Sequence, residues 1–174
     1  LIGPKKVAII GNNGVGKTPL INESSKHTKV PFAYRPQSYA TMMDVNKSAL
    51  ELLCDIRVKQ DKSKTMTLLG SLSFTFDEMN LPFDNLSGGQ KAKVFFTQLA
   101  LNKTQLLIMD EPTRNISPLS MEVLNEQIRS YKGALIVITH DRNLLDTLID
   151  EVYELTPDGL FKKDLDVVSN RFGQ

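Results

Sequence analysis

Residues 11–18 read GNNGVGKT and directly follow a short apolar run, KVAII, at residues 6–10. This is the spacing of a glycine-rich phosphate-binding loop, in which a strand leads into the loop and a helix follows it. Glycines let backbone N–H groups turn toward phosphate oxygens, and the start of the helix adds partial positive charge. The stretch therefore predicts a strand, a phosphate loop and a helix, which together open an α/β unit.

The side chains of this loop predict nucleotide binding. Lys17 can reach the β and γ phosphates as a point charge, and the Thr18 hydroxyl can coordinate Mg²⁺. Pro19 stands where a second Ser or Thr is usual, so we expect a weaker hold near the α phosphate. The residues expected to bind the nucleotide are Asn12, Asn13, Gly14, Val15, Gly16, Lys17, Thr18 and Pro19. The alternative is a glycine turn that merely joins a strand to a helix.

Residues 106–112 read LLIMDEP, an apolar run that ends in two adjacent carboxylates. Open parallel sheets bind their ligands at the carboxyl ends of the strands. Asp110 is placed there to hold Mg²⁺, directly or through water. Glu111 becomes the candidate base for a water that attacks the γ phosphate. An acidic pair alone can equally cap a helix, and the phosphate loop upstream favours the catalytic interpretation.

The remaining hydrophobic pattern predicts strands that alternate with helices. Apolar runs typical of strands lie at residues 30–34, 105–109, 134–139, 152–155 and 160–163. Helical spacing begins near residue 44 and again after residue 63, and it covers about residues 118–131 and 141–148. Two strands are apolar throughout, as in parallel sheets that are buried on both faces, and the last two form a closing hairpin. About residues 42–85 are expected to form a small helical subdomain.

Composition narrows the class of protein. The 174 residues have room for one domain, and 41% hydrophobic and 24% charged residues suffice for an ordinary core. A net charge of +1 gives no bulk attraction to nucleic acid or to anionic membranes. The single cysteine, Cys54, excludes an internal disulfide and fits a reducing compartment. No apolar run reaches the roughly 18 residues of a membrane span, so we expect no membrane insertion.

Residues 86–90 read LSGGQ, and with this motif the chain resembles the ATP-binding cassette (ABC) ATPases. By itself the pentapeptide could be a helix start capped by Ser87. Together with GNNGVGKT, Gln37 after a strand, LLIMDEP and ITHD at residues 138–141, it follows the family's order over nearly the whole chain. The resemblance implies one ABC-type P-loop NTPase domain over residues 1–174, a mostly parallel α/β sheet flanked by helices, with the family's first strands upstream of Leu1.

The resemblance also implies roles for single residues, with ATP and Mg²⁺ as cofactors. The implied catalytic residues are Glu111, His140 and Gln37, where His140 contacts the γ phosphate and Gln37 senses metal and water. The implied metal ligands are Thr18, Gln37 and Asp110. The residues that would bind the γ phosphate held by an opposing cassette are Ser87, Gly88, Gly89 and Gln90. Hydrolysis would then need a head-to-tail pair, and an isolated cassette would hydrolyse ATP poorly.

Within that family, residues 86–96 (LSGGQKAKVFF) and 111–120 (EPTRNISPLS) resemble the ABC-F proteins. These are soluble twin-cassette ATPases that act on ribosomes, and the likeness is greatest to the branch that confers antibiotic resistance. It implies a cytoplasmic location, a second cassette in the same chain or in a second copy, and the ribosome as partner. Ser117 departs from the pattern because it takes the place of an aspartate.

Two other functions remain open on the sequence. The chain could be the ATPase subunit of a membrane transporter, with a transmembrane protein as its partner. It could also be a nucleotide-gated binding module with little hydrolysis, as the departures at Pro19 and Ser117 suggest.

The segment after LSGGQ separates into two sets of side chains. Its apolar residues are expected to face the core, and they are Val94, Phe95, Phe96 and Leu99. Lys91 and Lys93 are expected to be solvated or to meet RNA phosphate.

Overall fold

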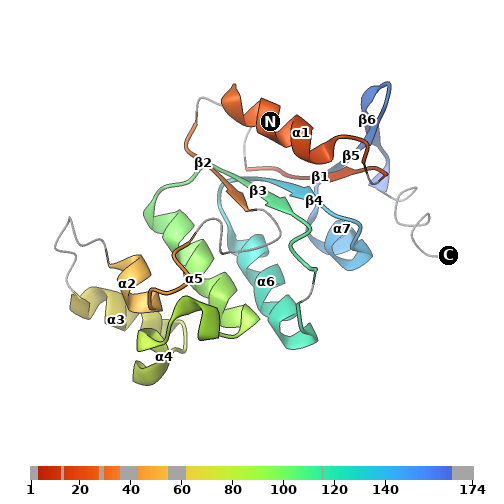
Figure 1. The fold of residues 1–174 in the computed structure, drawn as a ribbon. Coiled ribbons are helices and arrows are strands. Elements are labelled where there is room, and N and C mark those ends of the chain that lie inside the picture. Colours follow the sequence, from red (N-terminus) through yellow and green to blue (C-terminus); the bar gives the residue numbers. More distant parts are fainter. Residues whose placement is uncertain are drawn as a thin grey trace. The chain divides into compact units, whose positions relative to one another are not determined.

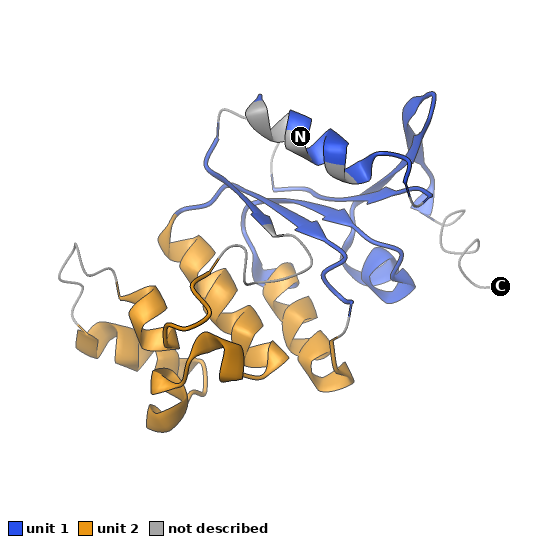
Figure 2. Ribbon diagram, in the orientation of Figure 1, with its two compact units in different colours: residues 1–37, 103–115, 129–174 blue, residues 38–102, 116–128 orange. Residues whose placement is uncertain are grey.

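The computed structural model describes residues 4–12, 14–27, 30–35, 43–54, 62–114 and 116–165. The chain divides into two compact units, coloured separately in Figure 2. The first, here called the sheet unit, comprises residues 1–37, 103–115 and 129–174. The second, the helical unit, comprises residues 38–102 and 116–128, and the expected helical region at 42–85 lies within it.

The sheet unit is built on one six-stranded sheet (Figure 1). Its elements are β1 (Lys6–Ile10), α1 (Lys17–Lys26), β2 (Phe32–Arg35), β3 (Leu106–Asp110), β4 (Ala134–Ile138), α7 (Arg142–Leu148), β5 (Glu151–Thr156) and β6 (Gly159–Lys163). The strand order is β2-β3-β4-β1-β5-β6, and only the β5–β6 pair is antiparallel. The predicted α/β fold with a mostly parallel sheet and a closing hairpin is therefore confirmed.

Apolar packing holds the helix after the loop against the sheet. Ile21 of α1 is buried in a cluster with Ile9 of β1, Ile108 of β3 and Ile138 of β4. In Figure 1, α7 lies on the other side of the sheet from α1. Because alternate residues of a strand point to opposite faces, the buried run from Leu107 to Met109 shows that β3 is covered on both faces, as predicted.

One strand begins later than the sequence pattern suggested. The expected strand covers residues 30–34, whereas β2 begins at Phe32 and ends at Arg35. Proline has no N–H to donate to a ladder, so Pro31 stays outside the strand. Its carbonyl nonetheless accepts the backbone N–H groups of Gln105 at 2.9 Å and Leu106 at 3.2 Å, which aligns β2 with β3.

The helical unit consists of short helices whose starts are capped by their own sequence. Its elements are α2 (Ala49–Leu53), α3 (Lys62–Ser71), α4 (Phe76–Asn80), the 3₁₀ turn η2 (Phe83–Asn85), α5 (Gly88–Leu101) and most of α6 (Pro118–Ser130). Capping boxes, in which the cap and the third helical residue bond reciprocally, start three of them. The pairs are Ser48 with Glu51, Thr75 with Glu78, and Ser87 with Gln90.

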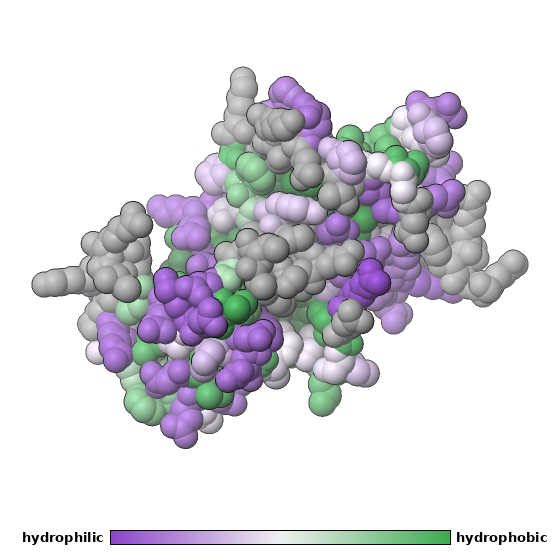
Figure 3. All heavy atoms as spheres, viewed as in Figure 1, coloured by the Kyte–Doolittle hydropathy of each residue, from purple (hydrophilic) through white to green (hydrophobic). Residues whose placement is uncertain are grey.

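The interior of the helical unit depends on α5. The four apolar residues that were expected to face the core, Val94, Phe95, Phe96 and Leu99, are all buried. The two lysines on α5 are not simply solvated. Lys91 pairs with Asp84 at 3.3 Å, and Lys93 donates to the Leu72 carbonyl at 2.8 Å. On the face seen in Figure 3, the described surface of this unit, at the lower left, is mainly hydrophilic.

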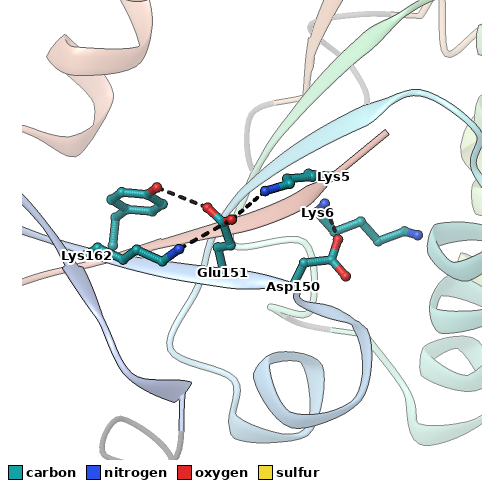
Figure 4. Close-up of polar contacts among 6 residues, drawn as sticks. Lys5, Lys6, Asp150, Glu151 and Lys162 are labelled. Atoms are coloured by element: carbon teal, nitrogen blue, oxygen red, sulfur yellow. Dashed lines mark hydrogen bonds and ion pairs between the residues drawn. The ribbon is translucent and has the colours of Figure 1, made fainter. Parts of the chain in front are cut away.

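Charged side chains join the first strand to the closing hairpin (Figure 4). Glu151 of β5 lies opposite Val7 in the β1–β5 register, and its carboxylate pairs with Lys5 at 2.6 Å and Lys162 at 3.4 Å. The Tyr153 hydroxyl donates to the same carboxylate at 3.0 Å. These hydrogen bonds lower the pKa of Glu151 from 4.5 to about 2, with the largest effect from Lys5, followed by Tyr153 and Lys162.

This cluster predicts an acid-dependent loss of stability. The pKa of Glu151 is lower in the folded than in the unfolded protein, so its contribution is fully present above pH 4.5 and is lost as the pH falls toward 2. We expect Glu151→Gln to lower the melting temperature by a few degrees at pH 7, because the pairs are partly solvated. Thermal unfolding followed by circular dichroism between pH 2 and pH 7 tests this.

The exposed carboxylate of Glu126 on α6 offers a matched control, and Glu126→Gln should leave the melting curve unchanged. A deficit of Glu151→Gln that stayed the same from pH 7 down to pH 2 would contradict the electrostatic explanation.

Candidate functional site

The phosphate loop runs from the end of β1 into α1. Lys17 is the first residue of α1, and its ammonium group donates to the Gly11 carbonyl and, at 3.1 Å, to the Asn12 carbonyl. The backbone N–H of Val15 donates to the same Asn12 carbonyl at 3.3 Å, which closes the turn. The loop thus curls around the lysine, and the positive charge lies at the start of the helix, where phosphates bind.

Gly11 is the loop position that tolerates no side chain. Its φ is +152°, and a Cβ there would lie 2.6 Å from the Leu155 carbonyl oxygen at the end of β5. No Cβ approaches backbone that closely, so the loop can pack against β5 only through glycine. Gly14 and Gly16 also have positive φ values, +81° and +102°, whereas an added Cβ on either would meet open space.

The register of the parallel strands brings the acidic pair to the loop. Asp110 pairs with Ile138 across β3–β4, and Ile138 pairs with Ile9 across β4–β1. The three strands therefore end at the same edge of the sheet, and their last residues differ by at most one position in the register. The phosphate loop follows β1 directly, Asp110 is the last residue of β3, and His140 lies two residues beyond β4.

Asp110 is buried and has a partner that the sequence interpretation missed. The Tyr34 hydroxyl at the end of β2 donates to Asp110 Oδ2 at 3.4 Å. Burial raises the pKa of Tyr34, and the negative charge of Asp110 raises it further, so the hydroxyl keeps its proton and remains a donor. The sequence signal for Tyr34 was its place near the end of a predicted strand, but only the β2–β3 pairing makes it a neighbour of Asp110.

Glu111 occupies a constrained backbone position just beyond β3. Its φ is +45°, which is unusual for a residue with a side chain, and its N–H donates to the Ile138 carbonyl at 2.8 Å. Its carboxylate accepts the backbone N–H of His140, and Oε1 lies 3.9 Å from His140 Nε2. Strained conformations of this kind concentrate at functional sites.

The electrostatics of Glu111 connect all the described candidate residues of this edge. Burial raises the pKa of Glu111, and His140 and Lys17 lower it, while the negative charge of Asp110 raises it. Four side chains that are far apart in the sequence therefore act on one another within a single site. A carboxylate with a raised pKa is a stronger proton acceptor than an ordinary one.

His140 is set by the turn that follows β4. Thr139 is fully buried, and its hydroxyl oxygen accepts the backbone N–H of Asp141 at 3.0 Å. Asp141 in turn caps α7 by accepting the N–H of Leu144 at 3.3 Å. These contacts fix the backbone on the carboxyl side of His140, so the ring is held beside Glu111.

Gln37 and Asn13 lie outside the described residues, and the Thr18 side chain does as well. Their roles stay predictions. Pro19 lies exposed in the first turn of α1, where a missing N–H costs little because that turn has no intrahelical acceptor.

The LSGGQ motif forms the start of α5 in the helical unit. Ser87 is the cap, and Gly88 and Gly89 are the first two helical residues. A Cβ on Gly88 would lie 3.0 Å from the Ser120 hydroxyl oxygen, so glycine lets α5 approach α6 there. Ser117 replaces an aspartate of the family pattern yet keeps the capping geometry, because its hydroxyl oxygen accepts the Ser120 N–H at 3.4 Å.

The donor set fits Mg²⁺ with a nucleotide triphosphate. Magnesium is usually held by one or two carboxylates together with phosphate oxygens and water. Asp110 could supply one such carboxylate, and the loop amides and the Lys17 ammonium group could supply contacts to phosphates. Within the described ranges, no cluster of three or more His, Cys, Asp or Glu side chains could hold a metal ion alone.

Comparison with known proteins agrees with this geometry. The profile of the ABC transporter family matches residues 4–114. The chain is 32% identical to "ABC transporter F family member 2" of Arabidopsis thaliana, covering 90% of this chain and 25% of the relative. It is 32% identical to "Erythromycin resistance ATP-binding protein MsrA" of Staphylococcus epidermidis, covering 98% and 33%. The chain thus spans only a quarter to a third of these relatives.

Solved structures share the fold. The cbiO1 protein of Clostridium perfringens, part of an ABC transporter complex, superposes with a TM-score of 0.74 at 17% identity, over 95% of this chain and 79% of that one. A dimeric ATP-binding cassette bound to ADP and phosphate superposes with a TM-score of 0.67 at 16% identity, over 94% and 86%. No helix in the described part of the chain is long and apolar enough to cross a membrane.

The profile match covers more than half of the chain, and it includes the phosphate loop, LSGGQ and the acidic pair. The chain belongs to the ABC transporter family, as an ATPase domain whose relatives include ABC-F proteins.

Proposed function

We propose that this chain is an ATP-hydrolysing cassette that works in a head-to-tail pair as part of an ABC-F protein acting on the ribosome. The convergence of Lys17, Asp110, Glu111 and His140 at one sheet edge is the observation that carries the ATPase part. These are the cation, the metal ligand, the base and the γ-phosphate contact that hydrolysis of a triphosphate requires.

Each candidate residue of the sheet unit has a task in this proposed mechanism. The loop amides and Lys17 would bind the phosphates, and Asp110, Thr18 and Gln37 would hold the metal. When bound, Mg²⁺ neutralises negative charge on the β and γ phosphates. Glu111 accepts the proton of the attacking water, since its carboxylate is held in place by the His140 N–H. His140 then lies beside Glu111, where it can donate to the γ phosphate.

The helical unit provides the second half of a site, for a nucleotide held by an opposing cassette. Ser87, Gly88, Gly89 and Gln90 at the start of α5 supply donors to that γ phosphate. The dimeric cassette among the similar solved structures supports pairing as a property of this fold. Hydrolysis by one isolated copy is then slow, because each nucleotide needs residues from two cassettes.

The choice of the ribosome as partner rests on similarity to ABC-F proteins. Both curated relatives described above are similar over 90% or more of this chain, and one is an erythromycin resistance protein. That similarity supports a cytoplasmic protein of the antibiotic-resistance branch. The likeness to the cbiO1 cassette of a transporter complex, at 17% identity, carries only the fold.

The role of Glu111 can be tested by replacing it. Glu111→Gln keeps the size of the side chain and one oxygen that can accept the His140 N–H, but it removes the carboxylate that accepts a proton. We expect ATP turnover by the full-length protein to fall by about 10² or more while ATP still binds. Phosphate release measures turnover, and fluorescent ATP measures binding. Unchanged turnover would mean that the chain acts as a nucleotide-gated module with another base or none.

The ribosome proposal has its own test in the same variant. A variant that binds ATP without hydrolysing it accumulates in the closed, paired state. We therefore expect the full-length Glu111→Gln protein to co-sediment with ribosomes when ATP is present and to stay in the supernatant when ADP replaces it. Association with membrane fractions instead, with none in the ribosome pellet, would favour the transporter subunit.

The contact between Tyr34 and Asp110 predicts an effect on magnesium. Tyr34→Phe removes the hydroxyl that orients the carboxylate, and groups that orient metal ligands affect metal affinity strongly. We expect the Mg²⁺ concentration for half-maximal ATPase activity to rise by up to about tenfold. This is the low end of the effects seen when a group that orients a metal ligand is removed, because the hydrogen bond is long at 3.4 Å. Magnesium titrations of ATPase activity and of fluorescent-nucleotide binding both report it.

Tyr131→Phe is the matched control, since the Tyr131 hydroxyl donates to the Thr104 carbonyl, which precedes β3 at the end away from Asp110. An identical magnesium requirement in wild type and Tyr34→Phe would exclude an orienting role for Tyr34.

A further inference from the structure

The two glycines of LSGGQ lie against a neighbouring helix. Gly88 and Gly89 open α5, and an added Cβ on Gly88 would lie 3.0 Å from Ser120 Oγ and 3.2 Å from Ser120 Cβ on α6. An added Cβ on Gly89 would lie 3.3 Å from a methyl carbon of Val123. Ser120 and Val123 are three positions apart, so they share one face of α6. The two helices lie side by side in Figure 1, and both glycines belong to their contact.

Backbone conformation does not explain why these positions are glycine. Neither Gly88 nor Gly89 is among the described glycines with positive φ, so other residues can adopt their backbone angles. Both lie in the first turn of α5, and alanine is a better helix former than glycine. Carbon atoms pack at about 3.5–4.0 Å, which is further than the 3.2 Å left beside Gly88. What position 88 lacks is therefore room for a side chain next to α6.

Ser120 is held in place by the cap of its own helix. The Ser117 hydroxyl donates to Ser120 Oγ at 3.0 Å, and Ser117 Oγ accepts the Ser120 N–H at 3.4 Å. The Met121 N–H donates to the Ser117 carbonyl at 2.9 Å and closes the first turn. The Ser120 side chain cannot turn away from Gly88 without losing its bond to Ser117. All of these residues belong to the helical unit.

This contact controls the donors at the start of α5. The N–H groups of Gly88 and Gly89 belong to the first turn and have no intrahelical acceptor. They are donors that the proposed function assigns to the γ phosphate of the opposing cassette. A side chain forced between α5 and α6 would shift them, and a misplacement of about 1 Å can cost on the order of 10²-fold in rate.

We infer that Ser120 is a positioning residue, whose side chain sets the place of Gly88 and so directs the N–H groups of LSGGQ toward the opposing cassette's nucleotide without touching that nucleotide. The inference rests on the proposed function, since it deepens the role of LSGGQ given there. It assigns the glycine at position 88 to the contact with α6 rather than to the approach of the phosphate.

The contact can be tested by filling it from one helix and emptying it from the other. Gly88→Ala adds the Cβ that meets Ser120, and Ser120→Gly removes both atoms that this Cβ would meet. We expect Gly88→Ala in the full-length protein to lower kcat for ATP about tenfold or more. The double variant Gly88→Ala/Ser120→Gly should recover to within about threefold of wild type, the remainder reflecting the poor helix propensity of glycine in α6.

Two further measurements separate positioning from a general loss of structure. Binding of fluorescent ATP to the phosphate loop should stay unchanged in Gly88→Ala, because the loop belongs to the sheet unit. Melting curves followed by circular dichroism accompany every variant. Should Gly88→Ala unfold at the assay temperature, the double variant is expected to restore the melting temperature as well as turnover, and failure to restore either contradicts the inference.

The chain offers two matched controls. Gly70→Ala adds a Cβ to α3 that would lie 3.9 Å from the terminal methyl group of Met79, an ordinary contact, so kcat should equal that of wild type. Gly88→Ala/Val123→Ala shrinks α6 at the side chain that meets Gly89 instead. It should stay as slow as Gly88→Ala. Recovery as complete as with Ser120→Gly would overturn the assignment to Ser120.

The outcomes also separate this inference from the function on which it rests. Ser87→Arg serves as the reference, since a large cation at the cap blocks the start of α5 for any phosphate. Abolished turnover in Ser87→Arg, together with a Gly88→Ala/Ser120→Gly variant as slow as Gly88→Ala, overturns the role of Ser120 alone, because the Cβ itself would then obstruct the nucleotide. Wild-type turnover in Gly88→Ala overturns that role too. Normal turnover in Ser87→Arg overturns the role of LSGGQ and the inference with it.

Discussion

The parallel pairing of β3 and β1 with β4 is the constraint on which the candidate site depends. It sets Asp110 and Ile9 level with Ile138, so the segments that follow these strands start at one edge. Packing maintains this register, because the buried side chains of Leu107, Ile108 and Met109 contribute roughly 1.5–3 kcal/mol each. A one-residue slip would exchange the faces of every side chain in the strand. The hydrophobic core therefore determines where the charges meet.

The candidate site itself works against stability. Glu111 has a positive φ that costs of order 1–3 kcal/mol, and its carboxylate is half-buried beside the charge of Asp110. The hydrogen bonds to Ile138 and His140 and the nearby Lys17 offset part of that cost. The strain is sustained because the flanking strands are fully packed, and it leaves a carboxylate with a raised pKa beside a histidine.

The helical unit solves a different problem with local chemistry. Its helices are short, and helices of five residues have little stability of their own. Capping boxes satisfy their first N–H groups, and buried side chains of α5 hold them together. The cap at the start of α5 is thus made within LSGGQ itself, by Ser87 and Gln90.

The sequence by itself determined the features that depend on neighbouring residues. The phosphate loop, the apolar strands, the hairpin and the core face of α5 follow from spacing, because side-chain periodicity and glycine placement act over a few residues. Tertiary structure decided the contacts between distant residues, such as Tyr34 with Asp110, 76 positions apart, and Gly11 with the Leu155 carbonyl. It also decided the start of β2, where the carbonyl rather than the side chain of Pro31 meets the next strand. Such contacts depend on strand register and helix packing, which arise only when the whole core assembles.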